Sequence, residues 1–211
     1  MYTRFPLLPF PRFLIILKIC FEGVGTMRSK HEGFDSVRAK IIATASELFT
    51  RTGVHGTSLN DIAAAAYIAK GTVYYYYPAK EALSLDVAEA LCDFISDALL
   101  SWVESVSREA EPEAELAALI QTLLGDAQRR RLYAVLLAEG SLDDLAIADL
   151  LTSAQEKWKV MFEVGALKLR LPQSREIRAR AGLFFTLLGG YALKPRTSAQ
   201  DWVEFASLLT R

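Results

Sequence analysis

The prediction of the fold starts from Thr57-Ser58-Leu59-Asn60-Asp61-Ile62-Ala63-Ala64-Ala65-Ala66-Tyr67-Ile68-Ala69-Lys70-Gly71-Thr72-Val73-Tyr74-Tyr75-Tyr76-Tyr77-Pro78, which we expect to form two short helices joined by a tight turn. Ser58 followed by Asp61 is typical of a capping box, because the hydroxyl accepts an N–H of the first turn while the carboxylate complements the positive helix end. A helix is therefore expected to begin near Leu59. Its small apolar face allows close packing against a neighbouring helix, as a helix-turn-helix requires.

The second helix is expected over residues 70–76, with Val73 and Tyr77 buried. Lys70, Thr72 and the tyrosine hydroxyls then face outward, and these are donors suited to phosphates and base edges. Four consecutive tyrosines cannot all face one way, so some of them belong to the core. A plain helical hairpin with a tyrosine-rich edge is the alternative interpretation of this pattern.

The stretch resembles the DNA-binding helices of the tetracycline-repressor (TetR) family of bacterial transcriptional regulators, and the resemblance covers roughly residues 37 to 85. A bare helix-turn-helix pattern is a weak signal, but a match of this length is a strong one. The residues that carry it are Arg38-Ala39-Lys40-Ile41-Ile42-Ala43-Thr44-Ala45, Leu48-Phe49, Gly53, Gly56-Thr57-Ser58-Leu59, Asp61-Ile62-Ala63, Lys70-Gly71-Thr72-Val73-Tyr74-Tyr75-Tyr76 and Lys80-Glu81-Ala82-Leu83.

The resemblance implies an all-α chain, with an N-terminal three-helix DNA-binding domain and a C-terminal helical domain for ligand binding and dimerisation. The predicted division is an extension over residues 1–34, the helix-turn-helix domain over 35–80 and the effector domain over 81–211. Overall charge is close to neutral, yet basic residues outnumber acidic ones between Met27 and Lys80. A basic module on an acidic body fits a nucleic-acid reader.

The implied function is that of a homodimeric, ligand-responsive regulator, a repressor that a small molecule releases from a pseudo-palindromic double-stranded DNA operator. The expected DNA contacts are Thr57, Ser58, Lys70, Gly71, Thr72, Tyr74, Tyr75, Tyr76 and Lys80. Thr57, Ser58 and Lys80 are expected to anchor phosphates, and the others lie on the recognition helix. The alternative is a sensing or interaction protein that keeps the fold but has weakened DNA binding.

Three departures from the family pattern favour that alternative. Tyr67 stands where family members usually carry Gly in the turn, and a left-handed conformation there costs a non-Gly residue about 1 to 2 kcal/mol. Ala69 and Ala79 stand at the expected starts of helices, where a polar cap contributes about 0.5 to 2 kcal/mol.

The first 26 residues differ in composition from the rest of the chain. Prolines and Lys18 interrupt their apolar runs, so no span approaches the roughly 20 apolar residues of a membrane helix. No convincing small-residue cleavage site follows them, as a signal peptide would need. We interpret Met27 as the translation start, or residues 1–26 as a disordered tail, and expect no membrane partner.

Helical periodicity continues to the end of the chain. The expected helices are 35–51, ended by Gly53; 79–107; 112–128; 132–139, ended by Gly140; 141–169, capped by Ser141 and Asp144; 176–193; and 198–209. In the family, the last two helices form the dimer interface, which predicts pairing through about residues 176–209. The faces that carry Phe184 and Leu188 suit it, although they also suit intramolecular core.

The effector remains unidentified. An apolar pocket and ordinary core are both compatible with the aromatic residues Trp102, Tyr133, Trp158, Phe162, Phe184 and Phe185.

The remaining motifs are uninformative. Two cysteines and two histidines show no metal-ligand spacing, so neither a metal nor a cofactor is expected. No catalytic constellation or phosphate-cradling loop is evident, so an enzyme is not expected. A reduced cytoplasmic setting is the default for such cysteine usage.

Overall fold

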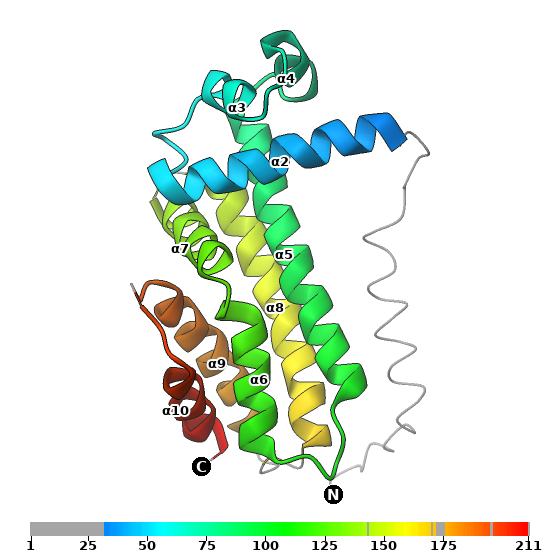
Figure 1. Ribbon diagram of the computed structural model, residues 1–211. Helices are drawn as coiled ribbons and strands as arrows, with labels where there is room; N and C mark the ends of the chain where they lie inside the picture. Colours follow the sequence, from blue (N-terminus) through cyan, green and yellow to red (C-terminus); the bar gives the residue numbers. More distant parts are fainter. Residues whose placement is uncertain (1–31, 143, 170, 172–175, 195, 211) are drawn as a thin grey trace, which may run out of the picture. The chain divides into compact units, whose positions relative to one another are not determined.

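The computed structural model describes residues 32–142, 144–169, 171, 176–194 and 196–210, and over these residues every regular element is an α-helix (Figure 1). The helices are α2 (Glu32–Thr52), α3 (Leu59–Ala65), α4 (Lys70–Tyr76), α5 (Lys80–Ser105), α6 (Pro112–Leu124), α7 (Ala127–Leu142), α8 (Leu145–Lys168), α9 (Glu176–Ala192) and α10 (Ala199–Thr210). The all-α prediction is confirmed. Residues 1–31 of the predicted extension lie outside the described residues. The first described helix, α2, begins at Glu32, before the predicted start at Asp35.

Val37–Arg211 form one compact unit by backbone contacts. The proposed division between residues 80 and 81 stays a prediction. None of the described helices is both long enough and apolar enough to cross a bilayer.

Helices α2, α3 and α4 pack together through the apolar residues that their spacing predicts to be buried. Ile41 and Phe49 of α2, Ile62 of α3 and Val73 of α4 are all fully buried. Gly53 follows α2 with φ +75°, and its N–H donates to the Phe49 carbonyl at 2.9 Å, which confirms the predicted left-handed cap.

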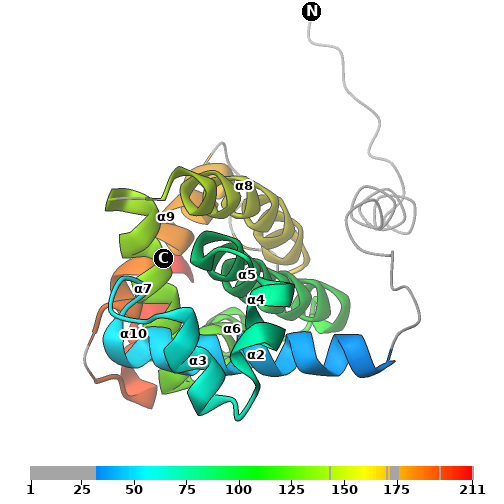
Figure 2. The ribbon, with the colours of Figure 1, turned by 90° about the horizontal axis from the view of Figure 1, so that it is seen from above.

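The long helix α5 extends from α3 and α4 into the rest of the unit. Its buried stripe packs lengthwise against α8, and the two helices lie side by side in both views (Figures 1 and 2). Gly165 of α8 permits the close approach, because a Cβ there would come within 2.1 Å of the Trp102 ring. The Trp158 indole N–H donates to Ser96 Oγ at 2.9 Å and fixes the register of the pair.

The middle of the chain corrects three predicted boundaries. The helix predicted over 112–128 ends at Leu124, and the next begins at Ala127, because Asp126 Oδ1 accepts the Arg129 N–H at 2.7 Å and starts a new turn. Gly140 lies inside α7 and does not end it. Asp144 alone caps α8, accepting from the N–H groups of Ala146 and Ile147.

Ser141 was predicted to cap α8, and the structure shows that it does not. Its hydroxyl donates instead to the Leu137 carbonyl, at 2.6 Å, within α7.

The aromatic residues near the C-terminus fill the interior of a single chain. Phe184 stacks on Phe162 with ring centroids 4.5 Å apart, and it also contacts Phe185 and Phe205. All six aromatic side chains considered for a ligand pocket are buried. Phe184 and Leu188 are both 0% exposed, so the expectation that they face a second subunit is wrong. Apolar periodicity identified the face correctly but did not show that α6, α7 and α8 cover it.

Candidate nucleic-acid interface

The start of α3 is built by a capping box, as predicted. Ser58 Oγ accepts the Asp61 N–H at 3.2 Å, while Asp61 Oδ2 accepts from the Ser58 hydroxyl at 2.6 Å and from the Ser58 N–H at 2.9 Å. These hydrogen bonds from Ser58, the hydroxyl foremost, hold the pKa of the Asp61 carboxyl below its usual value. The arrangement places the Ser58 hydroxyl on the exposed surface at the first turn of α3.

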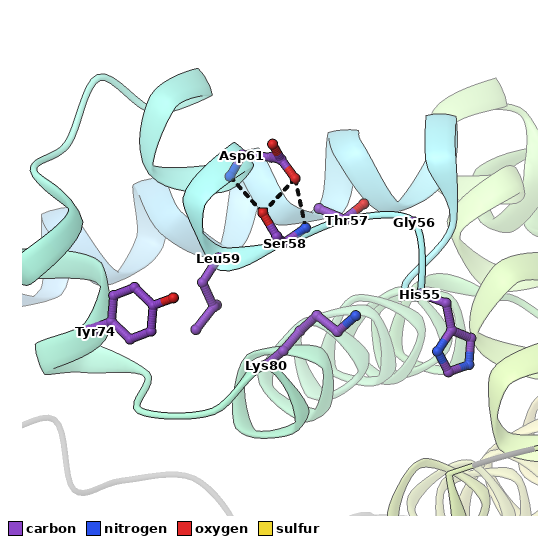
Figure 3. Close-up of a pocket in the computed structure, with 8 residues that line it drawn as sticks. All are labelled: His55, Gly56, Thr57, Ser58, Leu59, Asp61, Tyr74 and Lys80. Carbon is purple, nitrogen blue, oxygen red and sulfur yellow. Dashed lines mark hydrogen bonds between the residues drawn. The ribbon is translucent and has the colours of Figure 1, made fainter.

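A cleft of about 380 Å³ opens beside this cap, between α3, α4 and the start of α5 (Figure 3). Ser58, Tyr74 and Lys80 were predicted to contact DNA, and the structure brings all three to this one cleft. The residues that line it are His55, Gly56, Thr57, Ser58, Leu59, Asp61, Tyr74 and Lys80.

Lys80 is anchored at the cleft. Its ammonium donates to the Val54 carbonyl at 2.8 Å, which uses one of its three donors and leaves capacity for a phosphate oxygen. Tyr74 extends toward the same space from α4, with its side chain 45% exposed (Figure 3).

Helix α4 presents a polar and aromatic surface. Lys70, Gly71 and Tyr75 are exposed, and Thr72 and Tyr76 are half-buried. The Tyr75 and Tyr76 rings meet edge to face with centroids 5.6 Å apart. Val73 and Tyr77 are buried, as expected for the inner side of the helix.

Thr57 differs from the other predicted contacts because it is buried, with 3% of its surface exposed. Its hydroxyl donates to the Gly53 carbonyl at 2.8 Å and lies 2.8 Å from Thr52 Oγ1. These bonds brace the loop between α2 and α3. We therefore assign Thr57 a structural role and leave it out of the proposed DNA contacts.

The three departures from the family pattern have the predicted local geometry. Tyr67 adopts φ +53°, the left-handed conformation, and its side chain is 93% exposed. Ala69 and Ala79 are the N-cap residues of α4 and α5, and neither provides a side-chain hydrogen bond.

His55 is the cleft residue that sequence reasoning missed. Its Nε2 lies 3.3 Å from Oε1 of Glu139, a residue of α7. The sequence contains no local signal for this pair, because the two residues lie far apart along the chain. The position of His55 next to Gly56-Thr57, inside the family match, is the only hint that could have identified it.

Metal binding finds no support in the described part of the chain, where no group of three or more His, Cys, Asp or Glu side chains is arranged to hold an ion.

Comparisons with known proteins agree with the geometry. The family model described as bacterial regulatory proteins, tetR family, matches residues 41–87. The HTH-type transcriptional regulator LmrA of Bacillus subtilis is 29% identical over 146 residues, which cover 68% of this chain and 76% of LmrA. The HTH-type transcriptional repressor KstR2 of Rhodococcus jostii is 33% identical over 85 residues, which cover 40% of each chain.

A solved structure shares the fold. It is a regulator from Saccharomonospora viridis in complex with choline, with a TM-score of 0.67 and 18% identity. The alignment covers 82% of this chain and 94% of that one.

Proposed function

This chain belongs to the tetR family of bacterial regulatory proteins, and on that premise we propose that it is a homodimeric, ligand-responsive transcriptional repressor. A small molecule would release it from a pseudo-palindromic operator. Its relatives are HTH-type transcriptional regulators, and one of them is named a repressor.

The observation that carries the proposal is the convergence of Ser58, Tyr74 and Lys80 on one cleft beside the exposed side of α4. Hydroxyl and ammonium donors at the cleft suit phosphates, which position a protein on the duplex. Lys70 and Thr72 of the short helix would then reach base edges in the major groove. The proposed contacts are Ser58, Lys70, Gly71, Thr72, Tyr74, Tyr75, Tyr76 and Lys80.

Pairing of two subunits is supported by the outer faces of α9 and α10. Leu183, Val203 and Leu208 are 47%, 42% and 58% exposed, and a Cβ at Gly182 or Gly190 would meet no atom within 4 Å. Small residues beside exposed leucines allow a second helix to approach closely. Such a dimer would present two copies of α4 to successive major grooves.

Release from DNA would use α5, because this one helix begins at the cleft with Lys80 and continues along α8 to Ser105. A ligand that binds better to one arrangement of α5 and α8 would shift the population of the other. The choline complex of the Saccharomonospora protein supports a small-molecule effector in principle.

Footprinting and gel-shift titration on DNA upstream of the chain's own gene would test the proposal. A repressor should protect two half-sites about one helical turn apart, with an affinity that falls steeply as salt increases.

Weakened DNA binding is the second candidate, which the left-handed Tyr67 and the uncapped α4 and α5 favour. In that case the same titration would show only weak, sequence-independent binding.

A further inference from the structure

Arg130 is a buried cation near the start of α7. Its side chain is 5% exposed, whereas the next residue, Arg131, is exposed and the preceding one, Arg129, is half-buried over the Phe94 ring. A guanidinium is not deprotonated in proteins, so the buried group carries a full positive charge. Arginine is rarely buried without an opposite charge beside it, because an unpaired buried charge is costly. The surroundings of Arg130 should therefore supply a counter-charge.

The protein itself supplies only part of that counter-charge. Arg130 Nη1 donates to the Leu124 carbonyl at 3.0 Å. Leu124 is the last residue of α6, and the C-terminus of a helix carries about half a negative charge. Arg130 Nε is buried without a hydrogen-bond partner, and no carboxylate in the described part of the chain forms an ion pair with Arg130. The guanidinium thus lacks both an anion and an acceptor for Nε.

A second buried donor lies one turn further along α7. Tyr133 is 2% exposed, and its hydroxyl has no partner within hydrogen-bond distance among the residues that the structure describes. Burial raises the pKa of Tyr133 to about 12, while the Gln155 side chain of α8 acts in the opposite direction. An amide that favours the ionised phenol donates to its oxygen, so the hydroxyl proton still lacks an acceptor. Residues three apart share one side of a helix, which places Arg130 and Tyr133 together.

A carboxylate has the properties that these two donors require. It carries a negative charge, and its two oxygens can accept parallel N–H bonds from a guanidinium as well as an O–H bond. The other buried side chains of this part of α7, Leu132 and Leu136, are apolar. A phosphate ion would bring further oxygens that find no donor there, at a cost in free energy. An apolar monocarboxylate fits the site better than an inorganic anion does.

The position of α7 relates this pair to the DNA-reading part of the chain. Helix α7 follows α6 and packs against α5, α8 and α9 (Figure 1). Near its other end, Glu139 Oε1 lies 3.3 Å from Nε2 of His55, in the loop before α3. A ligand inserted beside Arg130 would shift α7 against the helices that it contacts. The same shift would change how that loop is held.

We infer that Arg130 and Tyr133 bind the carboxylate group of a small apolar monocarboxylate. The inference rests on the proposed function, because it names the chemical class of the effector. The carboxylate pairs with the Arg130 guanidinium and accepts from the Tyr133 hydroxyl. The apolar part of the ligand lies among the buried side chains of α7 and of the helices around it.

Thermal denaturation of the full-length protein tests the ligand class. The probes are hexanoate, decanoate, benzoate and phenylacetate, each compared with its neutral amide, and inorganic phosphate. At a saturating concentration, at least one carboxylate should raise the melting temperature by about 5 °C. Its amide and phosphate should not, since the amide has nearly the same shape but no charge.

Three variants test the two residues by titration calorimetry with the carboxylate that stabilises wild type. Arg130→Gln should bind it about a hundredfold more weakly, because the ion pair is lost. Tyr133→Phe keeps the buried ring and loses only the hydroxyl, so it should fold as wild type and bind about tenfold more weakly. Arg131→Gln, at the exposed neighbour on the same helix, is the matched control and should bind as wild type.

The inference is overturned if no carboxylate stabilises wild type more than its amide does. It is also overturned if Arg130→Gln and Tyr133→Phe bind the carboxylate as tightly as wild type, which would show that Arg130 only caps the end of α6.

Release from DNA tests the proposed function separately. The carboxylate that binds should lower the affinity of wild type for DNA upstream of its own gene, whereas its amide should not. If the carboxylate binds but never releases the DNA, the proposed ligand response is overturned while the carboxylate site stands. The two failures are thereby distinguishable.

Discussion

Tyr67 combines an unfavourable backbone conformation with an exposed ring. At φ +53° a residue with a Cβ costs about 1 to 2 kcal/mol, and a side chain that is 93% exposed offsets little of this by packing. The turn between α3 and α4 is therefore strained by one residue at the point where the family usually carries Gly.

Tyr67→Gly should raise the free energy of unfolding by about 0.5 to 1 kcal/mol, because relief of the strain exceeds the extra chain entropy of glycine. Urea denaturation would measure the change. Tyr67→Ala is the control and should give no comparable gain, since its Cβ retains the strain. A less stable Tyr67→Gly protein would show that the tyrosine ring stabilises the turn.

Lys70 and Thr72 should have different effects on DNA binding. Lys70→Ala should weaken binding to every sequence and reduce the salt slope by about 1, because its expected partner is a phosphate. Thr72→Ala should instead relax preference at a few base positions. Salt titrations on specific and random duplexes would distinguish the two, with the exposed Lys157→Ala as a control on α8. Unchanged affinity and slope for Lys70→Ala would argue against α4 as the recognition helix.

Among the helices, α2, α4 and α5 are joined by one polar cluster, in which Tyr77 is buried, Asp86 is half-buried and Arg38 is exposed. Asp86 of α5 accepts from the Tyr77 hydroxyl at 2.5 Å and from Arg38 of α2 at 2.6 Å. Burial, reinforced by the hydrogen bond to Asp86, raises the pKa of Tyr77 well above its usual value. The C-terminal end of α4 is thus tied to α2 and α5.

Tyr77→Phe should destabilise the protein by about 1 kcal/mol near neutral pH, because the half-buried Asp86 carboxylate loses one of its donors. The raised pKa means that the folded state keeps Tyr77 protonated, so stability is fully present below the unfolded pKa of about 10 and falls as pH rises above it. Tyr77→Phe should lessen that alkaline loss in denaturant titrations. Tyr75→Phe, on an exposed ring, should do neither.

For the whole molecule, the proposed pairing of two subunits involves the exposed side of the last two helices. Leu183→Asp combined with Leu208→Lys should give folded monomers with at least tenfold weaker operator binding, because charges would replace leucines at the proposed contact. Sedimentation velocity would measure the assembly and circular dichroism the fold. Leu142→Asp, at an exposed leucine of α7, is the control. An intact dimer in the double variant would locate the interface elsewhere.

The local features of the DNA-reading helices were predictable from the sequence. The Ser58–Asp61 capping box, the start of α3, the bounds of α4, and the left-handed Gly53 and Tyr67 were confirmed. Each depends on hydrogen bonds or sterics within about four residues, which residue types and spacing encode directly. The resemblance to the tetR family followed from the same stretch.

Tertiary structure was needed where burial or the path of the chain decides what a residue does. Periodicity marked Phe184 as apolar but did not reveal that its own chain covers it, and spacing alone did not distinguish Ser141 from Asp144 as a cap. Thr57 was predicted to contact DNA because the sequence does not show that the loop after α2 folds back and buries this side chain. Only the tertiary structure shows that Glu139 lies 3.3 Å from the His55 ring, because a contact between residues far apart in the chain leaves no trace in local sequence.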